Sequence, residues 1–556
     1  MNDIVFAHAS SIFSVSIICA FIMFALSFCR FRKITELTWA DLCVLLFLVA
    51  YLPDSFTVYT FWNIGCLCLL LFYLSVRLMY KLNYRYIYYG VLFVLFVHTV
   101  WGYLQYVEIL PGNNSYFKLT GPYHNPGILG GVMCLLLIIV IGGSFQFFSH
   151  FGRRKRMHFI VIIVIVLALP VVGLTEARAS WLALVLALLY LVYMRWGRQV
   201  SRKKQMIYSL GTIVVLPFLL FFFYTLKPLS ANGRVLIWKV SCQMIKDKPF
   251  TGFGKGGFEA NYLYYQAAYM KEGASDAERY VADNTHFAFN EVIRVAVEHG
   301  IPGAFVYVSF FIFICLLPTR RDIVSYTIKS TIGGIVVWGL FSYPHSVFGV
   351  MALLVASLAA LLNRQKKQTK ACLSVVPLRV FRLLMIAVLV PLLISIYSYY
   401  QWYDRFATYR KSTSVDEAIA APLELMRFRE KLPTDMAVLT FYANVLRKQQ
   451  DNKKLLEVIH TMEGLYPTPT LWIHKGDIYR KLGDMEKAEQ AYQLAAAMVP
   501  TRQKARYKLS LLYLHTGRTE EAVLLARCLL SEKVKNYGFE TFEMHKDLKR
   551  TFRDML

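Results

Sequence analysis

The chain has few charged residues, which make up 17% of its 556 residues, and acidic residues are scarcer than basic ones, at 35 against 61. Soluble globular proteins carry about 25% charged and about 45–50% apolar residues. Hydrophobic residues here reach 57%, which argues against both a large soluble enzyme and a disordered chain. The formal net charge of +26 is typical of nucleic-acid binding, unless membrane topology accounts for it.

Cysteine is also sparse, because ten residues in a chain of this length are too few for a disulfide scaffold. The sequence has no pair of cysteines separated by two residues, and most of its cysteines stand in apolar runs. We therefore expect the cysteines to act as small buried hydrophobic residues and expect no zinc site.

Long apolar runs are abundant. Because a membrane-spanning helix needs about 20 mostly apolar residues, these runs predict about twelve spans. The expected spans are 8–29, 38–52, 57–76, 86–107, 126–148, 158–175, 179–195, 207–226, 287–317, 323–341, 346–362 and 380–399. The first lacks basic residues before it and a clear cleavage site, so we expect a retained helix rather than a signal peptide.

Lysine and arginine gather at every second loop between these spans, and the intervening short loops have almost none. The basic clusters are Arg30 to Lys33, Arg77 with Lys81 and Arg85, Arg153 to Arg156, Arg195 to Lys204, Arg320 with Arg321, and Arg364 to Lys370. Basic loops are cytoplasmic as a rule. With twelve spans, both chain ends lie on the other side, and we expect no nucleic-acid partner.

A polar tail, residues 400–556, follows the last span. It contains a pattern typical of tetratricopeptide repeats, in which two packed helices recur every 34 residues. The pattern residues are Trp472, Gly476, Tyr479, Gly483, Ala488, Tyr492, Ala495 and Pro500, then Tyr513, Gly517 and Ala522, with a degenerate copy ending at Tyr466-Pro467. We expect an α-solenoid that binds a protein partner through residues 433–530, the alternative being a purely stabilising role. Deletion of residues 400–556 is then expected to spare the active site but to weaken acceptor choice or assembly.

The other long polar segment is the loop 227–286, on the same side as the tail. A loop of about 60 residues is more often functional than structureless. Apolar residues at helical spacing predict an amphipathic helix over 234–247, ended by Pro249. The glycine-rich run from Gly252 to Gly257 is not a phosphate-binding P-loop, because it lacks that motif's Gly-Lys-Ser/Thr end, and it favours a tight turn.

Two residues of the outer face suggest chemistry. Asp283 or Asn284 is a suitable N-cap for a helix ended by Gly300, which would place His286 in its first turn. The positive end of a helix dipole would keep that imidazole neutral, as a general base requires, although a structural hydrogen bond is the alternative. Arg178, at the outer end of two spans, offers a planar cationic group for a diphosphate, or a partner for Glu176.

The order of several short motifs along residues 1–400 resembles the O-antigen ligase and O-antigen polymerase superfamily of bacterial membrane glycosyltransferases. These motifs are Gly121 to Pro126, Thr175 to Trp181, Gly233-Arg234 with Trp238, Pro249 to Gly254, Asn284 to His286, and His299 to Gly303. The resemblance implies an all-α membrane bundle followed by a tetratricopeptide solenoid. The expected divisions are N-terminal spans over 1–226, a catalytic periplasmic loop over 227–286, C-terminal spans over 287–399 and a periplasmic repeat domain over 400–556.

The resemblance further implies transfer of a glycan from undecaprenyl diphosphate to lipid A core or a protein hydroxyl, outside a Gram-negative inner membrane. Carried over by position, Arg178 and Arg234 would hold the diphosphate and His286 would be the base. Substrate contacts are expected at Asn284, Lys255, Gly254, His124 and Asn125. Direct displacement would invert the anomeric centre and needs no metal or nucleotide cofactor, which agrees with the absence of an Asp-x-Asp motif from the outer loops.

Other functions stay open at this point. A polymerase that joins repeat units shares these motifs, and a membrane scaffold that recruits partners through its repeats would need no catalysis. A transporter or flippase is disfavoured, because the spans contain few polar residues. Two departures from the family pattern concern the acceptor: Asp283 stands where a small or basic residue is expected, and the loop from Glu108 to Tyr123 is short.

Overall fold

The computed structural model describes residues 15–19, 38–50, 60–78, 83–114, 116–150, 155–197, 201, 203, 211, 217–218, 221–365, 378–535, 537–553 and 555. Within these ranges the regular structure is helical and contains no β-strand, which confirms the all-α expectation. Most residues of the expected spans 8–29 and 207–226 lie outside the described ranges, as do parts of the basic clusters at 30–33, 77–85, 153–156, 195–204 and 364–370.

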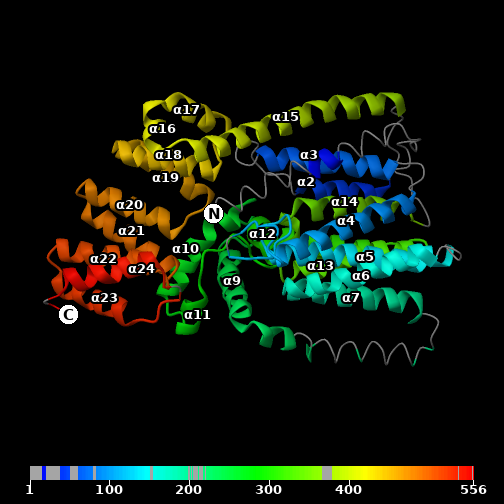
Figure 1. The fold of residues 1–556 in the computed structure, drawn as a ribbon, viewed down its shortest axis with the longest axis horizontal. Helices are drawn as coiled ribbons and strands as arrows, with labels where there is room; N and C mark the ends of the chain where they lie inside the picture. Colours follow the sequence, from blue (N-terminus) through cyan, green and yellow to red (C-terminus); the bar gives the residue numbers. More distant parts are fainter. Residues whose placement is uncertain are drawn as a thin grey trace. The chain divides into compact units, whose positions relative to one another are not determined.

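The chain divides into two compact units. The membrane unit comprises residues 1–223, 289–292 and 305–404, and the loop–repeat unit comprises residues 224–288, 293–304 and 405–556. The long polar loop and the tail, although far apart in sequence, thus belong to one unit. Figure 1 labels the helices of both.

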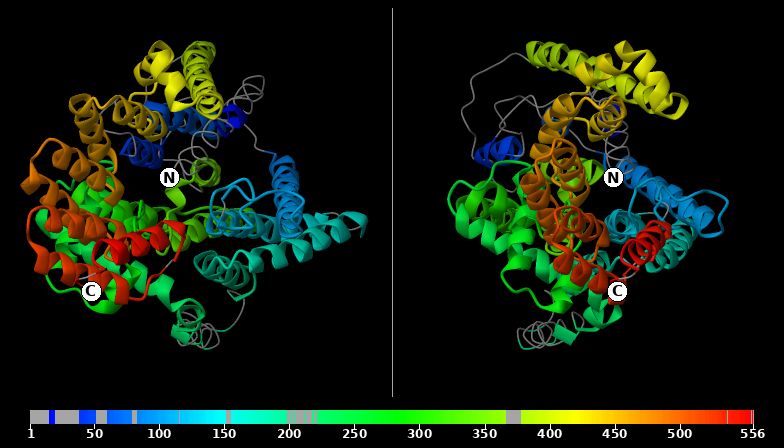
Figure 2. Two further views of the ribbon diagram at one scale, coloured as in Figure 1. Left: turned by 60° about the vertical axis from the view of Figure 1, so that its left-hand side comes forward. Right: turned by 90° about the vertical axis from the view of Figure 1, so that its left-hand side faces the viewer.

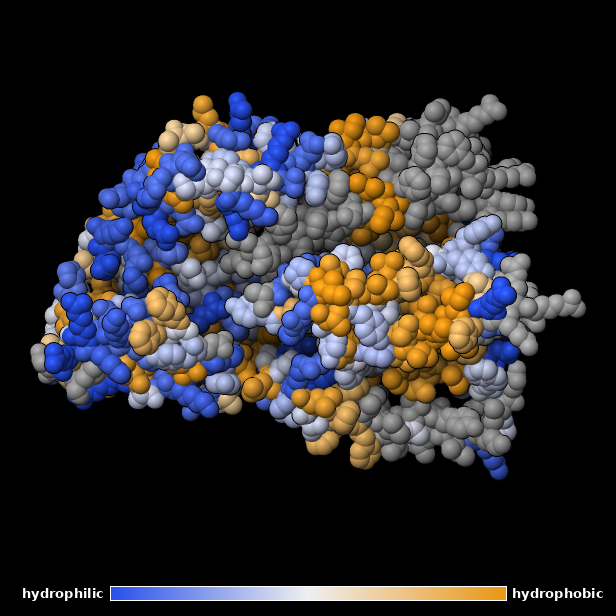
Figure 3. Space-filling model, viewed as in Figure 1, coloured by the Kyte–Doolittle hydropathy of each residue, from blue (hydrophilic) through white to orange (hydrophobic). Residues whose placement is uncertain are grey.

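The membrane unit is built from apolar helices that coincide with the expected spans. They are α2 (Trp39–Ala50), α3 (Thr60–Leu78), α4 (Tyr84–Tyr106), α5 (Pro126–His150), α6 (Lys155–Leu174), α7 (Arg178–Arg195), α13 (Ile323–Gly339) and α14 (Phe348–Leu362), with parts of α12 (Glu291–Leu316) and α15 (Leu378–Ser412). Five of the described helices, α4, α5, α6, α7 and α12, are long and apolar enough to cross a membrane. Exposed hydrophobic side chains are concentrated on α4, α6 and α7, and Figure 3 shows a hydrophobic surface over this part of the membrane unit, as contact with lipid requires. The chain is a multi-pass membrane protein.

Glycines on α5 allow its neighbours to approach closely. A Cβ atom at Gly131 would stand 2.1 Å from the ring of Trp338 on α13, and one at Gly143 would stand 2.5 Å from the ring of Tyr88 on α4. Small residues serve helix packing in membranes because apolar burial alone does not drive helices together there. Helix α5 is thereby the shared neighbour of α4, α6, α7 and α13.

A buried ion pair joins α2 to α3. Arg77, which the sequence groups with a basic loop, is instead fully buried, and its Nε lies 2.7 Å from the Asp41 carboxylate. Asp41 also accepts a hydrogen bond from the Tyr73 hydroxyl at 2.7 Å, and Arg77 donates one to the Asn363 amide oxygen at 2.9 Å. These bonds satisfy a charge pair that burial would otherwise penalise.

The loop–repeat unit contains two groups of helices. The loop forms α9 (Pro228–Asp247), α10 (Gly257–Lys271) and α11 (Asp276–Val281). The tail forms α16 (Val415–Ala420), α17 (Pro422–Lys431), α18 (Met436–Gln449), α19 (Asn452–Leu465), α20 (Pro469–Lys481), α21 (Met485–Met498), α22 (Gln503–His515), α23 (Thr519–Ser531) and α24 (Phe539–Thr551). The tail helices follow one another as a stack of pairs (Figure 2), which confirms the expected solenoid.

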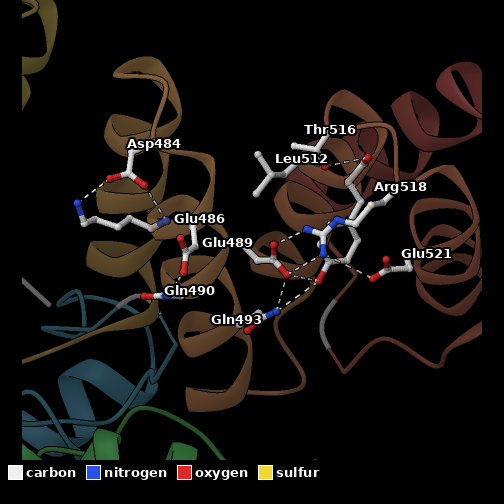
Figure 4. A network of polar contacts seen from close by, with 11 residues as sticks. Asp484, Glu486, Glu489, Gln490, Gln493, Leu512, Thr516, Arg518 and Glu521 are labelled. Atoms are coloured by element: carbon white, nitrogen blue, oxygen red, sulfur yellow. Dashed lines mark hydrogen bonds and ion pairs between the residues drawn. The ribbon is translucent and has the colours of Figure 1, made fainter.

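The spacing of the repeats has a direct packing explanation. A Cβ atom at Gly476 would stand 2.5 Å from the ring of Tyr492, so glycine lets α20 and α21 meet. Between α21 and α22, the Tyr513 hydroxyl donates to the Glu489 carboxylate at 3.1 Å (Figure 4). Arg518 pairs with the same carboxylate, and its guanidinium carbon lies 4.0 Å from the centre of the Tyr513 ring. The pattern residues therefore fasten successive helices to one another.

Candidate functional site

Helix α12 is interrupted at Gly300, and the glycine-rich turn, residues 252–257, packs against this interruption. Gly300 has φ 70° and ψ −179°, and Pro302 has no N–H with which to bond the Glu298 carbonyl. The backbone N–H of Gly254 donates to that carbonyl at 2.9 Å instead. Gly254 was expected to contact substrate, but its N–H is already hydrogen-bonded within the protein.

Glycine is required on both sides of this contact. A Cβ atom at Gly252 would stand 2.4 Å from the backbone of Glu298, and one at Gly300 would stand 2.4 Å from the Phe250 carbonyl oxygen. Gly252, Gly254 and Gly256 all have positive φ, between 66° and 79°. The predicted turn is therefore confirmed, and the turn and the break in α12 form one structure. Lys255, also expected to contact substrate, lies in this turn with its ammonium nitrogen buried.

A group of charged residues lies beneath the turn, and sequence reasoning missed it. The Glu298 carboxylate accepts hydrogen bonds from the Gly256 N–H at 3.0 Å and from Arg294 at 2.6 Å. Burial, and then the nearby negative charge of Glu298, raise the pKa of Glu259 to about 8, against the weaker opposing effect of Arg294. At neutral pH most molecules therefore hold Glu259 as a neutral acid.

We expect Glu259→Gln to raise the apparent melting temperature of the detergent-solubilised protein at pH 8.5. Because the pKa of Glu259 is higher in the folded than in the unfolded chain, the charged carboxylate lowers stability as pH rises from about 4.5 toward 8. Glutamine removes that cost, and each kcal/mol gained in the free energy of unfolding raises the melting temperature by about 2–4 °C. The gain is expected to shrink toward pH 5, and an equal gain at both pH values would contradict this explanation.

The segment that carries His286 is not helical, so the predicted N-cap is wrong. Residues 282–290 are irregular and α12 begins at Glu291, where the Asn290 amide oxygen accepts a hydrogen bond from the Val292 N–H at 2.9 Å. Phe289 has φ 50°, a left-handed conformation that interrupts a helix. His286 thus lies before the helix, and the dipole argument for its neutral form loses its basis.

Helix α9, which contains Arg234, is hydrogen-bonded to this segment. The Trp238 indole N–H donates to the Ala288 carbonyl at 3.0 Å, and Lys239 pairs with Glu278 of α11 at 2.7 Å. Arg234 and Trp238 are four residues apart and therefore share one face of the helix. The expected helix over 234–247 is confirmed within the longer α9, which also contains Arg234, one helical turn before Trp238.

The tail packs directly against the same segment. The His286 imidazole stacks on the Tyr466 ring, with centroids 3.8 Å apart and planes 23° apart. Asp283 accepts a hydrogen bond from Arg502 at 3.0 Å, and Gln266 of α10 donates to the Met498 carbonyl at 2.6 Å. The acidic residue that departs from the family pattern is therefore the partner of a tail arginine.

Two buried polar atoms near this contact lack hydrogen-bond partners. They are the Asn284 amide oxygen and the Tyr466 hydroxyl oxygen. An unsatisfied buried polar atom costs about 1–3 kcal/mol, so such atoms in a native structure often serve function. The sequence predicted Asn284 as a substrate contact. It indicated no functional role for Tyr466, which only marked the end of a degenerate repeat.

The remaining expected residues lie in the membrane unit. Arg178 is the first residue of α7, is half-buried, and its guanidinium donates to the Phe223 carbonyl. A Cβ atom at Gly130, in the first turns of α5, would stand 2.4 Å from the Thr175 hydroxyl and 2.6 Å from Ala177. Helices α5 and α7 therefore begin close together, and their positive ends join Arg178 in favouring an anion.

His124 and Asn125 precede α5. The Asn125 amide oxygen accepts a hydrogen bond from the Gly127 N–H at 2.7 Å, as a helix cap does. His124 is buried, and burial lowers its pKa, which favours the neutral imidazole. Among the residues that the structure describes, no three His, Cys, Asp or Glu side chains gather in a way that could hold a metal ion.

Two family models match parts of the chain. The model of the O-antigen ligase family matches residues 163–308, the range that contains Arg178, Arg234 and His286, and that of the tetratricopeptide repeat matches residues 469–500. No curated protein matches the chain with significance. The matches to an O-antigen ligase model and, further along the chain, to a tetratricopeptide-repeat model confirm the resemblance seen in its sequence.

Proposed function

We propose that this enzyme transfers a glycan from undecaprenyl diphosphate to an acceptor hydroxyl on the periplasmic face of the inner membrane. The family match supports glycan transfer of the ligase or polymerase type. The observation that supports this choice of residues is the hydrogen bond from the Trp238 indole to the Ala288 carbonyl, which joins the helix that contains Arg234 to the segment that contains His286. We place the repeats in the periplasm, because the loop they contact is an outer loop by the distribution of basic residues.

The two arginines bind the donor diphosphate in this proposal. Arg178 lies where α5 and α7 begin, and Arg234 lies on α9. Guanidinium groups match diphosphate oxygens in shape and stay charged at every physiological pH. They stabilise the negative charge that grows on the diphosphate as the glycosidic bond breaks.

His286 takes the proton of the acceptor hydroxyl. The acceptor oxygen then bonds to the anomeric carbon as the bond from that carbon to the diphosphate oxygen breaks, and undecaprenyl diphosphate leaves with the electron pair. One displacement inverts the anomeric centre. The diphosphate is already a good leaving group, so this route requires no metal or nucleotide from the protein.

The proposal is tested by the glycans of cells whose only copy carries Arg234→Ala. We expect full-length glycan to accumulate on undecaprenyl diphosphate, because loss of one charged donor at a transition state costs about 10²–10³-fold in rate. Lipid-linked, lipid A-linked and protein-linked glycans are separated by size. Lys239→Ala is the matched control, since Lys239 is a cation of the same helix that already pairs with Glu278.

The acceptor that stays empty identifies the reaction. Unmodified lipid A core identifies a ligase, and an unmodified protein hydroxyl identifies an O-linked transferase. An acceptor that carries one repeat unit identifies a polymerase instead. A profile identical to that of wild type and of Lys239→Ala would remove Arg234 from the reaction.

A further inference from the structure

The tail lies against the candidate base rather than apart from it. Besides the His286–Tyr466 stack, three contacts join the tail to the loop: Asp283 with Arg502, Gln266 with the Met498 carbonyl, and Tyr264 with Trp472, whose rings are 6.0 Å apart. The tail residues in these contacts lie in the turn between α19 and α20 (Tyr466), in α20 (Trp472), at the end of α21 (Met498) and just after it (Arg502). A structure that only recruits partners would not require them.

Tyr466 is held firmly in place. It is 4% exposed and lies in the turn Tyr466-Pro467-Thr468, where the Tyr466 N–H donates to the Met462 carbonyl at 2.9 Å. The Thr468 hydroxyl caps α20 by accepting a hydrogen bond from the Leu471 N–H. A ring fixed in this way restricts the rotation of an imidazole stacked on it.

His286 gains support from outside its own segment through the Tyr466 ring. Residues 282–290 form no helix, and a catalytic group on an irregular segment keeps its orientation only through its neighbours. Trp238 fixes the backbone at Ala288, but that bond leaves the imidazole plane undetermined. The stack on the Tyr466 ring restrains that plane.

We propose that Tyr466 of the tail is a positioning residue for the reaction, whose ring orients the His286 imidazole toward the acceptor hydroxyl. The inference rests on the proposed function of His286. It replaces the expectation that the tail is dispensable for the active site, because a chain without residues 400–556 lacks this ring.

The first test compares Tyr466→Leu, which removes the ring, with Tyr466→Phe, which keeps it. The donor is the lipid-linked glycan extracted from cells carrying Arg234→Ala, supplied with the unmodified acceptor fraction of the same cells. We expect Tyr466→Leu to lower kcat by at least about tenfold, since small misplacements of a catalytic group are costly. The donor KM is expected to change by less than about twofold, and Tyr466→Phe to restore kcat.

Tyr513→Leu is the matched control, because Tyr513 is a buried tyrosine of the repeat core, remote in sequence from the turn. It weakens the solenoid without touching His286, and we expect it to keep kcat near the wild-type value. Equal losses of kcat in Tyr513→Leu and Tyr466→Leu would mean that Tyr466 acts only through the stability of the tail, and would overturn the proposal.

The second test does not depend on transfer. Diethyl pyrocarbonate modifies accessible neutral imidazoles, and mass spectrometry of the full-length protein measures its reaction rate at His286. We expect a severalfold faster reaction in Tyr466→Leu and an unchanged rate in Tyr466→Phe and Tyr513→Leu. An unchanged modification rate at His286 in Tyr466→Leu would refute the positioning role, whichever donor the enzyme uses. A faster modification rate, together with full transfer activity in His286→Ala, would instead refute the proposed function of His286 and leave the contact with Tyr466 intact.

Discussion

Alanine at position 286 is expected to reduce glycan transfer by about 10²–10⁴-fold, the contribution typical of a general base. Donor binding is expected to persist, because the diphosphate is assigned to Arg178 and Arg234. In the purified enzyme the loss therefore falls on kcat, with little change in the donor KM. Direct binding of the lipid-linked donor to His286→Ala provides the independent measurement.

The control for this experiment is another histidine of the same unit. His460 lies on α19 with its side chain 88% exposed, and nothing in the proposed reaction uses it. His460→Ala is expected to transfer glycan at the wild-type rate. Added imidazole is expected to restore part of the activity of His286→Ala, because the removed ring leaves space for it. Full activity of His286→Ala without imidazole would exclude His286 as the base.

Removing one partner of the buried ion pair in the membrane unit is expected to have the largest effect on stability. Asp41→Ala leaves the guanidinium of Arg77 without its carboxylate while the side chain stays fully buried. Loss of one partner of a buried pair typically costs about 3–5 kcal/mol. The apparent melting temperature in detergent, measured by the fraction of protein that stays monodisperse, is expected to fall by about 2–4 °C for each kcal/mol.

A double variant separates the charge from the packing. Asp41→Leu combined with Arg77→Met replaces the pair with apolar side chains of similar size, which often costs little or nothing. We expect its melting temperature to lie closer to wild type than that of either single variant. If both single variants lose less than about 1 kcal/mol of unfolding free energy, the pair contributes no more to stability than a solvent-exposed ion pair does, and the expectation based on its burial is wrong.

The fold was largely predictable because its signals are local. Apolar runs of membrane-spanning length placed α4 to α7 and α12, and the spacing of Gly476, Ala488 and Tyr492 identified the repeats. The turn at Gly252 to Gly257 was also predictable, since four of its six residues are glycines, which adopt positive φ readily, and three of them do so. None of these inferences depended on which distant segments meet.

The environment of His286 was not predictable, because distant residues determine it. Asp283 has a suitable side chain for capping a helix, but its carboxylate bonds Arg502 and the adjacent Asn284 N–H, and Asn290 caps the helix instead. The raised pKa of Glu259 likewise depends on Glu298, which α12 brings to it. A single sequence contains each of these residues but not the contact between them.

The stack of His286 on Tyr466 has a consequence for the synthesis of the chain. A ribosome completes His286 long before it reaches Tyr466, and the intervening segment includes α12 to α14 and the first helices of the tail. A nascent or prematurely terminated chain therefore presents the imidazole without the ring that orients it. On our proposal, the cell obtains a fully active transferase only from chains that have been translated and folded through the repeats.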